Sequence, residues 1–432
     1  MAFRSGTLSY ARFKVQQHGG SAAPQLREVT HDHLETLRQN VLTPGEIGEP
    51  RPVEFGWCGG RHVFDERFAP DSNVFGETLL AGLRCDTNKV PAELKRAYRA
   101  MAETAFAEEA ATGFLSRREK LAAREEAEER CRRELVEGRH RRSKCLDVAW
   151  TLPTGIVLAP AFSDAHSAGL RDLFQTSFEA RLVPLSSGTL AYDILAARGR
   201  SRDYDDLRPT AFTSPPAGYA AADDVDAVHA LAGADGGRPQ ASWAFVTPEA
   251  SDFLGNEFLM WLWWRSDEDD AAFDTNLGLA VVAIDRVLDM ECPWSVTGKQ
   301  MLKADAPARS PEARRGLKNG KWPRKAGLMM SLGSQQQFEC VFQSDRFQFT
   351  ALKLPPADDD VTSLREIIEH RLTALQDFDR AMTAIYTQFL DVRASHSWPG
   401  VRDRMARWIA GRRSASPAEI SVEVKQPVAV GS

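Results

Sequence analysis

Residues 146–185 read LDVAWTLPTGIVLAPAFSDAHSAGLRDLFQTSFEARLVPL, and this stretch indicates the fold class. Leu146 to Trp150 and Ile156 to Ala159 are apolar runs of strand length, separated by the turn residues Pro153 to Gly155. Ser163 is placed to cap a following helix, and Arg181 to Leu185 is a third strand. A β-hairpin followed by a helix and a strand predicts an α+β fold with mixed or antiparallel sheets, in which the helix covers one face.

Strands and helices of the same kind are expected on both sides of this stretch. A helix from Asp252 carries Phe258, Trp261 and Trp264, whose spacing beside Leu and Met is more typical of core packing than of base stacking. Further strands are expected at Gly6 to Val15, Val53 to Cys58, Thr78 to Cys85, Leu277 to Met290, Gly327 to Leu332, Phe338 to Gln343 and Phe347 to Leu354.

Two consecutive helices are expected between Lys89 and Lys144. The first, with an apolar stripe of Leu94, Tyr98, Met101 and Ala105, is followed by a second that ends at Gly138. Because the second helix has few apolar residues, we expect residues 89–144 to form a solvated, projecting arm. Its charges are expected to pair along the helix, and Ser116 with Glu119 has the pattern of a capping box. The expected ion pairs are Glu126 with Arg130, Glu128 with Arg132, and Glu129 with Arg133.

The chain length sets the domain expectations. With 432 residues, 43% of them hydrophobic, two or three sub-domains are expected. Residues 1–355 form the main region, with a variable insertion at 197–250 that is rich in Ala, Gly, Asp and Pro. Residues 358–413 form a C-terminal helical extension, and 414–432 form a disordered tail.

The C-terminal extension contains a long helix with apolar residues seven apart. This seam predicts either a coiled-coil contact or a helix lying along its own domain, and Arg371, which interrupts the seam, favours the second. The seam residues are Ile368, Leu375, Met382 and Phe389.

No cofactor or metal ion is expected from the spacing of the usual ligand residues. His31 and His33 form a close pair without a second ligand cluster. No apolar stretch has the length of a signal peptide or a membrane span, so we expect a cytoplasmic protein. The six cysteines include no C-x-x-C pair and are expected to be reduced and mostly buried: Cys58, Cys85, Cys131, Cys145, Cys292 and Cys340.

Motifs of the common enzyme classes are missing from the sequence. The GLKNGK of Gly316 to Lys321 has too few residues between its glycines for a phosphate loop, and Trp322 follows where Ser or Thr should bind magnesium. The acidic runs Asp267 to Asp270 and Asp358 to Asp360 leave open a metal-dependent exonuclease, although consecutive loop carboxylates are more typical of solvated surface.

Positive charge is concentrated in two stretches, although the net charge of the chain is −6. Phe114 to Lys144 has eleven basic residues and seven acidic, a balance of +4, and Lys299 to Lys325 has nine and two, a balance of +7. Basic side chains without acidic neighbours suit nucleic-acid phosphates, since binding releases counterions. The candidate phosphate-binding residues are Arg117, Arg118, Lys120, Arg139, Arg141, Arg142, Lys144, Lys299, Lys303, Arg314, Arg315, Lys318, Lys321, Arg324 and Lys325.

An ordered series of motifs resembles the recombination-associated protein RdgC family. The series spans most of residues 1–355, outside the insertion, and the order of its pieces is more specific than any one of them. They are NKVPAELKRAY at 88–98, SRREK at 116–120, RLVPLSSGTLAYDIL at 181–195, NEFLMWLWWRS at 256–266, TGKQMLK at 297–303, NGK at 319–321 and FQFTALKLP at 347–355.

The resemblance implies a non-enzymatic, nucleoid-associated protein that binds DNA with little sequence preference. Family members form a closed ring-shaped homodimer around duplex DNA and restrain a RecA-type recombinase. Their helical arm closes one side of the ring, and a Lys-Gln pair, matched here by Lys299 and Gln300, faces the hole. This chain departs from the family at Glu137 to His140, where members often carry a Pro-Arg-Ala-Phe-like run.

The ligands implied by the resemblance are double-stranded DNA, single-stranded DNA, a second copy of the chain and a RecA-type recombinase, without a membrane. Two other functions stay open at the level of sequence. One is the exonuclease, and the other is a non-catalytic scaffold that holds protein partners through the arm and the long C-terminal helix.

Overall fold

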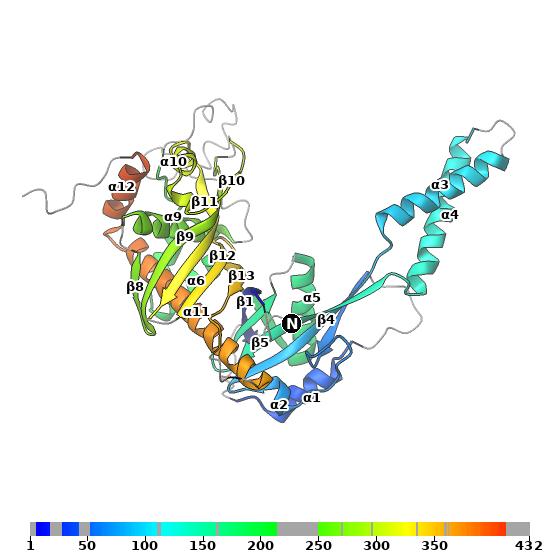
Figure 1. Cartoon of the computed structure of the whole chain (residues 1–432), viewed down its shortest axis with the longest axis horizontal. Coiled ribbons are helices and arrows are strands. Elements are labelled where there is room, and N and C mark those ends of the chain that lie inside the picture. Colours follow the sequence, from blue (N-terminus) through cyan, green and yellow to red (C-terminus); the bar gives the residue numbers. More distant parts are fainter. Residues whose placement is uncertain are drawn as a thin grey trace, which may run out of the picture. The chain divides into compact units, whose positions relative to one another are not determined.

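A computed structural model describes residues 6–17, 28–42, 52–109, 114–160, 164–213, 249–268, 271–294, 297–333, 336–357, 361 and 363–411. The chain divides into two compact units (Figure 1). Unit 1 consists of Met1–Pro184 with Ala357–Leu372, and unit 2 of Leu185–Pro356 with Thr373–Ser432. Both units combine antiparallel strands with helices, so the expected α+β class is confirmed.

The sheet of unit 1 contains the hairpin, helix and strand predicted from residues 146–185. Its strands follow the order β7, β1, β6, β5, β4, β2, and the short β3 pairs with β4. Helix α5 (Asp164–Phe178) connects β6 to β7. The strands are β1 (Leu8–Gln17), β2 (Val53–Cys58), β3 (Val74–Phe75), β4 (Thr78–Asn88), β5 (Arg141–Thr151), β6 (Ile156–Pro160) and β7 (Ala180–Pro184).

One face of this sheet forms the core of unit 1. Trp57, Leu83 and Val157 from the strands are buried together with Leu170 and Phe174 of α5. The residues that alternate with them in β4 point to the opposite face, because successive strand side chains alternate. Two short helices, α1 (His31–Gln39) and α2 (Pro70–Asn73), also belong to this unit.

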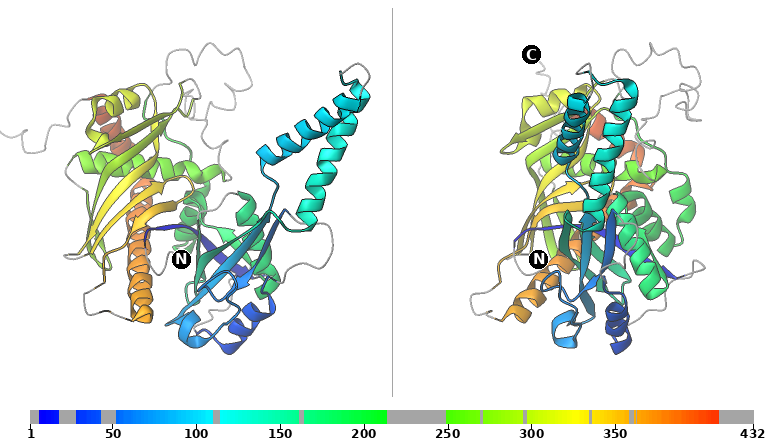
Figure 2. Two further views of the ribbon diagram at one scale, coloured as in Figure 1. Left: turned by 45° about the vertical axis from the view of Figure 1, so that its right-hand side comes forward. Right: turned by 90° about the vertical axis from the view of Figure 1, so that its right-hand side faces the viewer.

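Helices α3 (Ala92–Glu109) and α4 (Arg117–Val136) pack side by side as a hairpin between β4 and β5 (Figures 1 and 2). The capping box is confirmed, since Ser116 Oγ accepts from the Glu119 amide and Glu119 Oε2 accepts from the Ser116 amide. The apolar stripe is only partly as expected. Leu94 is half-buried, but Met101 is 57% exposed and Ala102 is buried instead.

The three expected ion pairs along α4 are wrong. None of them comes within 4 Å in the part of the chain that the structure describes, whereas Arg124 pairs with Glu128 at 2.8 Å. Arg130 lies instead over the ring of Tyr98, 4.2 Å from its centroid. The contact of Arg130 with Tyr98 of α3 thus replaces the ion pair that was expected between Arg130 and Glu126 within α4.

The sheet of unit 2 has the strand order β10, β9, β11, β12, β13, with β8 paired to β9. Helix α9 (Phe253–Asp267) packs on β9 and β11. Its Phe258, Trp261 and Trp264 are buried, which confirms the core interpretation. The strands are β8 (Ala272–Thr275), β9 (Gly278–Glu291), β10 (Gln300–Ala304), β11 (Trp322–Leu332), β12 (Gln336–Gln343) and β13 (Gln348–Lys353).

The long helix α11 (Leu364–Arg393) packs within its own chain. Leu375, Met382 and Phe389 are all fully buried, and the ring of Phe378 lies tilted against that of Phe338 in β12, with the centroids 5.2 Å apart. From Thr373 onward the helix therefore lies along unit 2, which agrees with the second interpretation of the sevenfold spacing, whereas residues 364–372 belong to unit 1. The other helical segments of unit 2 are α6 (Ser187–Ala197), α7 (Ser201–Asp205), η3 (Ala250–Asp252), η4 (Pro307–Arg309), α10 (Pro311–Lys318) and α12 (Trp398–Ile409).

A buried ion pair fixes the end of α11 to α9. Arg393 donates to Glu257 at 2.5 Å, and the side chains are 7% and 0% exposed. The second oxygen of Glu257 accepts from the backbone amide of Thr210 at 2.6 Å. Thr210 belongs to the expected insertion, of which residues 197–213 are therefore packed in unit 2. Residues 214–248 and the expected tail at 414–432 lie outside the described residues.

Candidate nucleic-acid interface

The basic stretch from Lys299 to Lys325 lies entirely in unit 2, but its side chains do not share one surface. In the register of the sheet, Asp289 of β9 lies between Met301 of β10 and Lys325 of β11. The neighbouring Leu288 and Met290 point to the other face, where they are buried. The row containing Asp289 therefore lies on the face opposite the core.

Three lysines gather around Asp289 on this face, and we call them the lysine cluster: Lys299, Lys303 and Lys325. Burial raises the pKa of Asp289, and the positive charges of the three lysines oppose that shift. Lys299 is strongly exposed, with 76% of its side chain accessible. Among the described residues, Lys303 and Lys325 form no ion pair within 4 Å. The cluster is thus positive and open to a ligand.

A pocket of about 230 Å³ lies beside the lysine cluster. Asp289 and Glu291 of β9, Met301 of β10, and Lys325 of β11 are among its lining residues. The Oδ1 atom of Asp289 is buried and has no hydrogen-bond partner. Asp289 therefore places a negative charge among the lysines without contributing a hydrogen bond from that oxygen to the fold.

The expectation that acids are scarce around this stretch is wrong, because acids from β9 and from the turn after β12 reach it. Glu291 pairs with Lys299 at 3.4 Å and with Arg324 at 2.6 Å. Arg324 also pairs at 3.1 Å with Asp345, whose side chain is 2% exposed. Arg324 lies where the pairing of β11 with β9 shifts register. Its ion pair with Asp345 neutralises a buried carboxylate of unit 2.

The side chains of the neighbouring residues Lys299 and Gln300 make different contacts. Gln300 lies opposite Met290, and its Oε1 accepts from Lys321 Nζ at 3.2 Å. Its Nε2 donates to the Glu312 carbonyl of α10 at 3.5 Å. Lys299 instead reaches Glu291. Gln300 and Lys321 are thus hydrogen-bonded to each other, whereas Lys299 contacts Glu291 with a side chain that is still 76% exposed.

The basic residues of α10 are directed to different neighbours. Arg314 pairs with Asp267 at 2.8 Å, and the same carboxylate accepts from Trp408 Nε1 of α12 at 2.7 Å. Lys318 lies beside Gly411, and Arg315 is exposed without an ion pair in the described part of the chain. Arg314 therefore links α10, α9 and α12.

The basic residues after Gly138 belong to a turn and to strand β5 of unit 1. Strand β5 begins at Arg141, which pairs with Glu54 at 2.7 Å, and Arg139 pairs with Glu137 at 2.5 Å. The expectation that these residues lack neutralising acids is wrong for both. Arg142 and Lys144 are exposed on β5 and alternate in direction with Arg141.

The remaining candidates lie at the start of α4. Arg117, Arg118 and Lys120 are exposed, and none forms an ion pair within the residues that the structure describes. They are balanced along the same helix by five glutamates before Glu134. This group is therefore less positive than the lysine cluster.

Sequence patterns missed the acidic residues that set the charge of this face. Asp289 and Glu291 belong to a strand that was expected, but only its register with β10 and β11 places them among the lysines. Within the described residues, no three or more His, Cys, Asp or Glu side chains form a group that could hold a metal ion. Asp269, Asp270 and the run at 358–360 lie outside the described residues.

Comparisons with known proteins leave the chain without an assigned family. No protein-family model matches it, and no curated protein shows significant similarity to it. Of the helices that the structure describes, none combines the length and apolar character needed to cross a membrane.

Proposed function

We propose that this protein binds duplex DNA without sequence preference and that the lysine cluster supplies its main phosphate contacts. The observation that carries the proposal is the gathering of Lys299, Lys303 and Lys325 on a sheet face that points away from the core. Ammonium groups held on a rigid sheet contact phosphate oxygens without reading bases, because phosphates carry no sequence information.

The resemblance to the RdgC family supports a role in recombination. On that basis, two copies of the chain encircle duplex DNA and restrain a RecA-type recombinase. The hairpin of α3 and α4 is then the projecting arm that reaches the partner subunit. Its charges are balanced, with ten basic and ten acidic residues between Ala92 and Val136, which suits a protein contact better than the main contact with DNA.

The experiment that tests DNA binding is a salt series with labelled duplexes of unrelated sequence. Each phosphate contact contributes about −0.9 to the slope of log affinity against log salt concentration. We expect a steep slope and similar affinities for all duplexes. Replacing Lys299, Lys303 and Lys325 together by Ala should weaken every duplex about equally and make the slope shallower, by up to about 0.9 for each lost contact.

A matched control removes the same number of positive charges elsewhere in unit 2. The variant Lys353→Ala/Arg402→Ala/Arg407→Ala removes cations of β13 and α12, of which Lys353 and Arg402 are already paired with Glu339 and Asp403. It should leave the slope nearly unchanged. A flat salt dependence of the unmodified protein, or equal losses in the two triple variants, would contradict the proposal.

A further inference from the structure

A cavity of about 370 Å³ lies in unit 1, where the ends of several elements meet. Its lining residues come from the end of β1, from α1, from the end of β5 and the turn that follows, from the end of α5 and from the start of β7. All of them belong to unit 1, so the cavity is distinct from the lysine cluster of unit 2. Its volume is in the range of small-molecule sites, about 300–1,000 Å³.

Three ring side chains that contact one another line the cavity. The rings of Trp150 and His33 are 5.6 Å apart, and the ring of Phe178 lies 5.1 Å from Trp150 and 6.4 Å from His33. Val15 and Leu152 add aliphatic surface. The cavity therefore offers apolar contacts to the body of a ligand, and its aromatic rings attract a cation that lies within about 6 Å.

The formal charges that line the cavity are negative. Asp32 of α1 and Glu179, which follows α5, supply carboxylates, and no lysine or arginine is among the described residues that line the cavity. The N-terminal turn of α1 and the C-terminal turn of α5 meet here, so opposite ends of two helix dipoles offset each other. The two carboxylates therefore decide that the cavity suits a positive group.

The backbone of Glu179 is held in the left-handed region, with a φ of 53°. Glycine is usual at this position after a helix, because a side chain makes the conformation costly. The amide of Glu179 donates to the Gln175 carbonyl of α5 at 3.0 Å, which fixes the residue at the end of the helix. Its carboxylate thus has a defined place beside the cavity.

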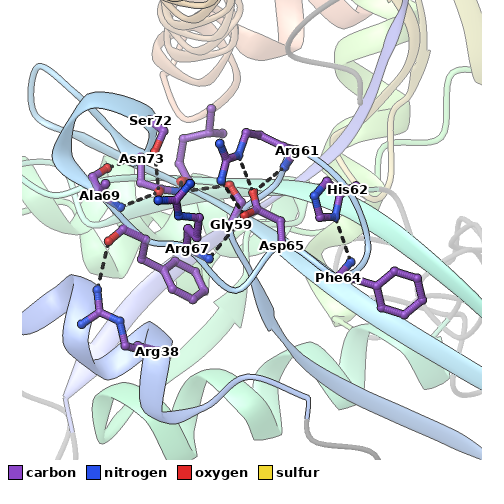
Figure 3. A network of polar contacts seen from close by, with 12 residues as sticks. Arg38, Gly59, Arg61, His62, Phe64, Asp65, Arg67, Ala69, Ser72 and Asn73 are labelled. Atoms are coloured by element: carbon purple, nitrogen blue, oxygen red, sulfur yellow. Dashed lines mark hydrogen bonds and ion pairs between the residues drawn. The ribbon is translucent and has the colours of Figure 1, made fainter.

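Helix α1, which supplies part of the lining, is fixed to the rest of unit 1. Its Leu34 and Leu37 are buried in the core of the unit. Arg38 donates to the Phe68 carbonyl at 3.1 Å, and hydrogen bonds to Asp65 brace the loop that carries Phe68 (Figure 3). A cavity built on fixed elements loses less free energy to ordering when a ligand binds.

The lining residue His33 retains a hydrogen-bond donor. Its Nδ1 accepts from the Thr30 amide at 3.1 Å, so the neutral ring carries its proton on Nε2. Burial lowers the pKa of His33, which favours this neutral form. In the described part of the chain, no group accepts a hydrogen bond from Nε2. This N–H group can therefore donate to an oxygen of a ligand.

A metal ion does not suit the cavity as well as an organic cation does. The described residues form no group of three or more His, Cys, Asp or Glu side chains that could hold a metal ion. An ammonium group needs no such set of ligands, because carboxylates and ring faces attract it without coordination bonds.

We propose that this cavity binds a small organic ammonium ion that has an apolar body and an oxygen acceptor. The ammonium group lies near Asp32 and Glu179, the body lies against the aromatic rings, and the oxygen accepts from the Nε2–H group of His33. This site goes beyond the binding of DNA and does not depend on it.

The test compares choline with its uncharged isostere 3,3-dimethylbutan-1-ol on the full-length protein. Titrations followed by saturation-transfer NMR give a dissociation constant for each probe. We expect choline to bind about five-fold or more tightly than the isostere, because only choline carries the charge that the carboxylates and rings attract. Equal affinities would overturn the proposal and indicate an apolar site. A protein that does not bind choline would overturn it as well.

The variant Asp32→Asn/Glu179→Gln keeps the side-chain sizes and should remove most of the advantage of choline over the isostere. Both carboxylates are exposed, so the variant should fold, which circular dichroism checks. Glu35→Gln/Asp172→Asn is the matched control, since it removes two acids of α1 and α5 that do not line the cavity. It should leave both affinities nearly unchanged. Equal losses of choline affinity in the two double variants would also overturn the proposal.

Discussion

Asp252 is a buried carboxyl whose ionisation opposes folding. Burial raises its pKa from 3.8 to about 6, although it accepts from the Gly188 amide at 2.9 Å. The unfolded carboxyl loses its proton near pH 4 and the folded one near pH 6, so the folded state binds the extra proton between these values. The free energy of unfolding should therefore fall as pH rises through this window, by up to about 3 kcal/mol.

Asp252→Asn should remove this part of the pH dependence. We expect urea unfolding at about pH 4 and pH 7 to show a smaller difference in the free energy of unfolding for the variant than for the unmodified protein. The comparison isolates Asp252, because all other titrating groups are shared. An unchanged difference would show that another group carries the dependence.

Asp289 provides a second test at the scale of single residues. Its charge lies among the three lysines, and its Oδ1 atom has no hydrogen-bond partner. Asp289→Asn should therefore increase the affinity for duplex DNA without unfolding the protein. Exposed charge interactions are worth about 0.2–1 kcal/mol, which corresponds to an increase of roughly 1.4-fold to 5-fold.

Fluorescence anisotropy with a labelled duplex measures the affinity change. Asp274→Asn is the control, since Asp274 is exposed on β8, which pairs with the other end of β9. It removes the same charge and should change the affinity less. Weaker binding by Asp289→Asn would mean that this carboxylate helps to hold the lysines in position.

At the scale of elements, Glu134 joins the two helices of the α3–α4 hairpin to the turn that follows. Its carboxylate accepts from the Tyr98 hydroxyl of α3 at 2.6 Å and lies 2.8 Å from His140 Nε2. These hydrogen bonds, His140 first, lower the pKa of Glu134. Glu134→Gln should weaken both contacts and loosen the base of the hairpin.

Hydrogen exchange followed by mass spectrometry tests this prediction. Backbone amides of α3 and α4 should exchange faster in Glu134→Gln, whereas those of α9 and β11 in unit 2 should not change. Glu126→Gln on the exposed surface of α4 is the control and should have little effect. Equal exchange in both variants would show that helix packing alone holds the hairpin.

The buried pair Glu257–Arg393 tests how the C-terminal helix is attached. Arg393→Met leaves a charged Glu257 buried without its partner, which should cost about 3–5 kcal/mol of unfolding free energy. Glu257→Met/Arg393→Met removes both charges and should recover much of that loss. Chemical denaturation of the two variants measures the difference. A double variant as unstable as Arg393→Met would indicate that the Thr210 contact matters more.

For the whole molecule, the proposed ring makes a topological prediction. Two chains of 47.9 kDa give a dimer of about 96 kDa, which light scattering can measure. A closed protein ring should slide off the ends of linear DNA at high salt but stay on circular DNA of the same sequence. Cutting the circular DNA should then release the protein. Equal retention on both forms, or a monomer in solution, would argue against encirclement.

Local patterns were sufficient for most of the elements. The hairpin, helix and strand of residues 146–185, the capping box at Ser116 and the buried helix at Phe253 depend on contacts between residues close in sequence. The ion pairs expected along α4 failed for a different reason. Arg130 has an alternative partner in Tyr98, which belongs to another helix and cannot be inferred from spacing in α4.

The sequence by itself determined the α+β class, the strands that carry the basic residues and the excess of positive charge between Lys299 and Lys325. Only the tertiary structure decided which of those charges remain available. Arg314 and Arg324 are paired with acids more than thirty residues away. Lys299, which contacts Glu291 but is 76% exposed, meets Lys303 and Lys325, which are unpaired among the described residues, through strand register. Such pairings depend on contacts between distant segments, and residue spacing along the chain does not specify them.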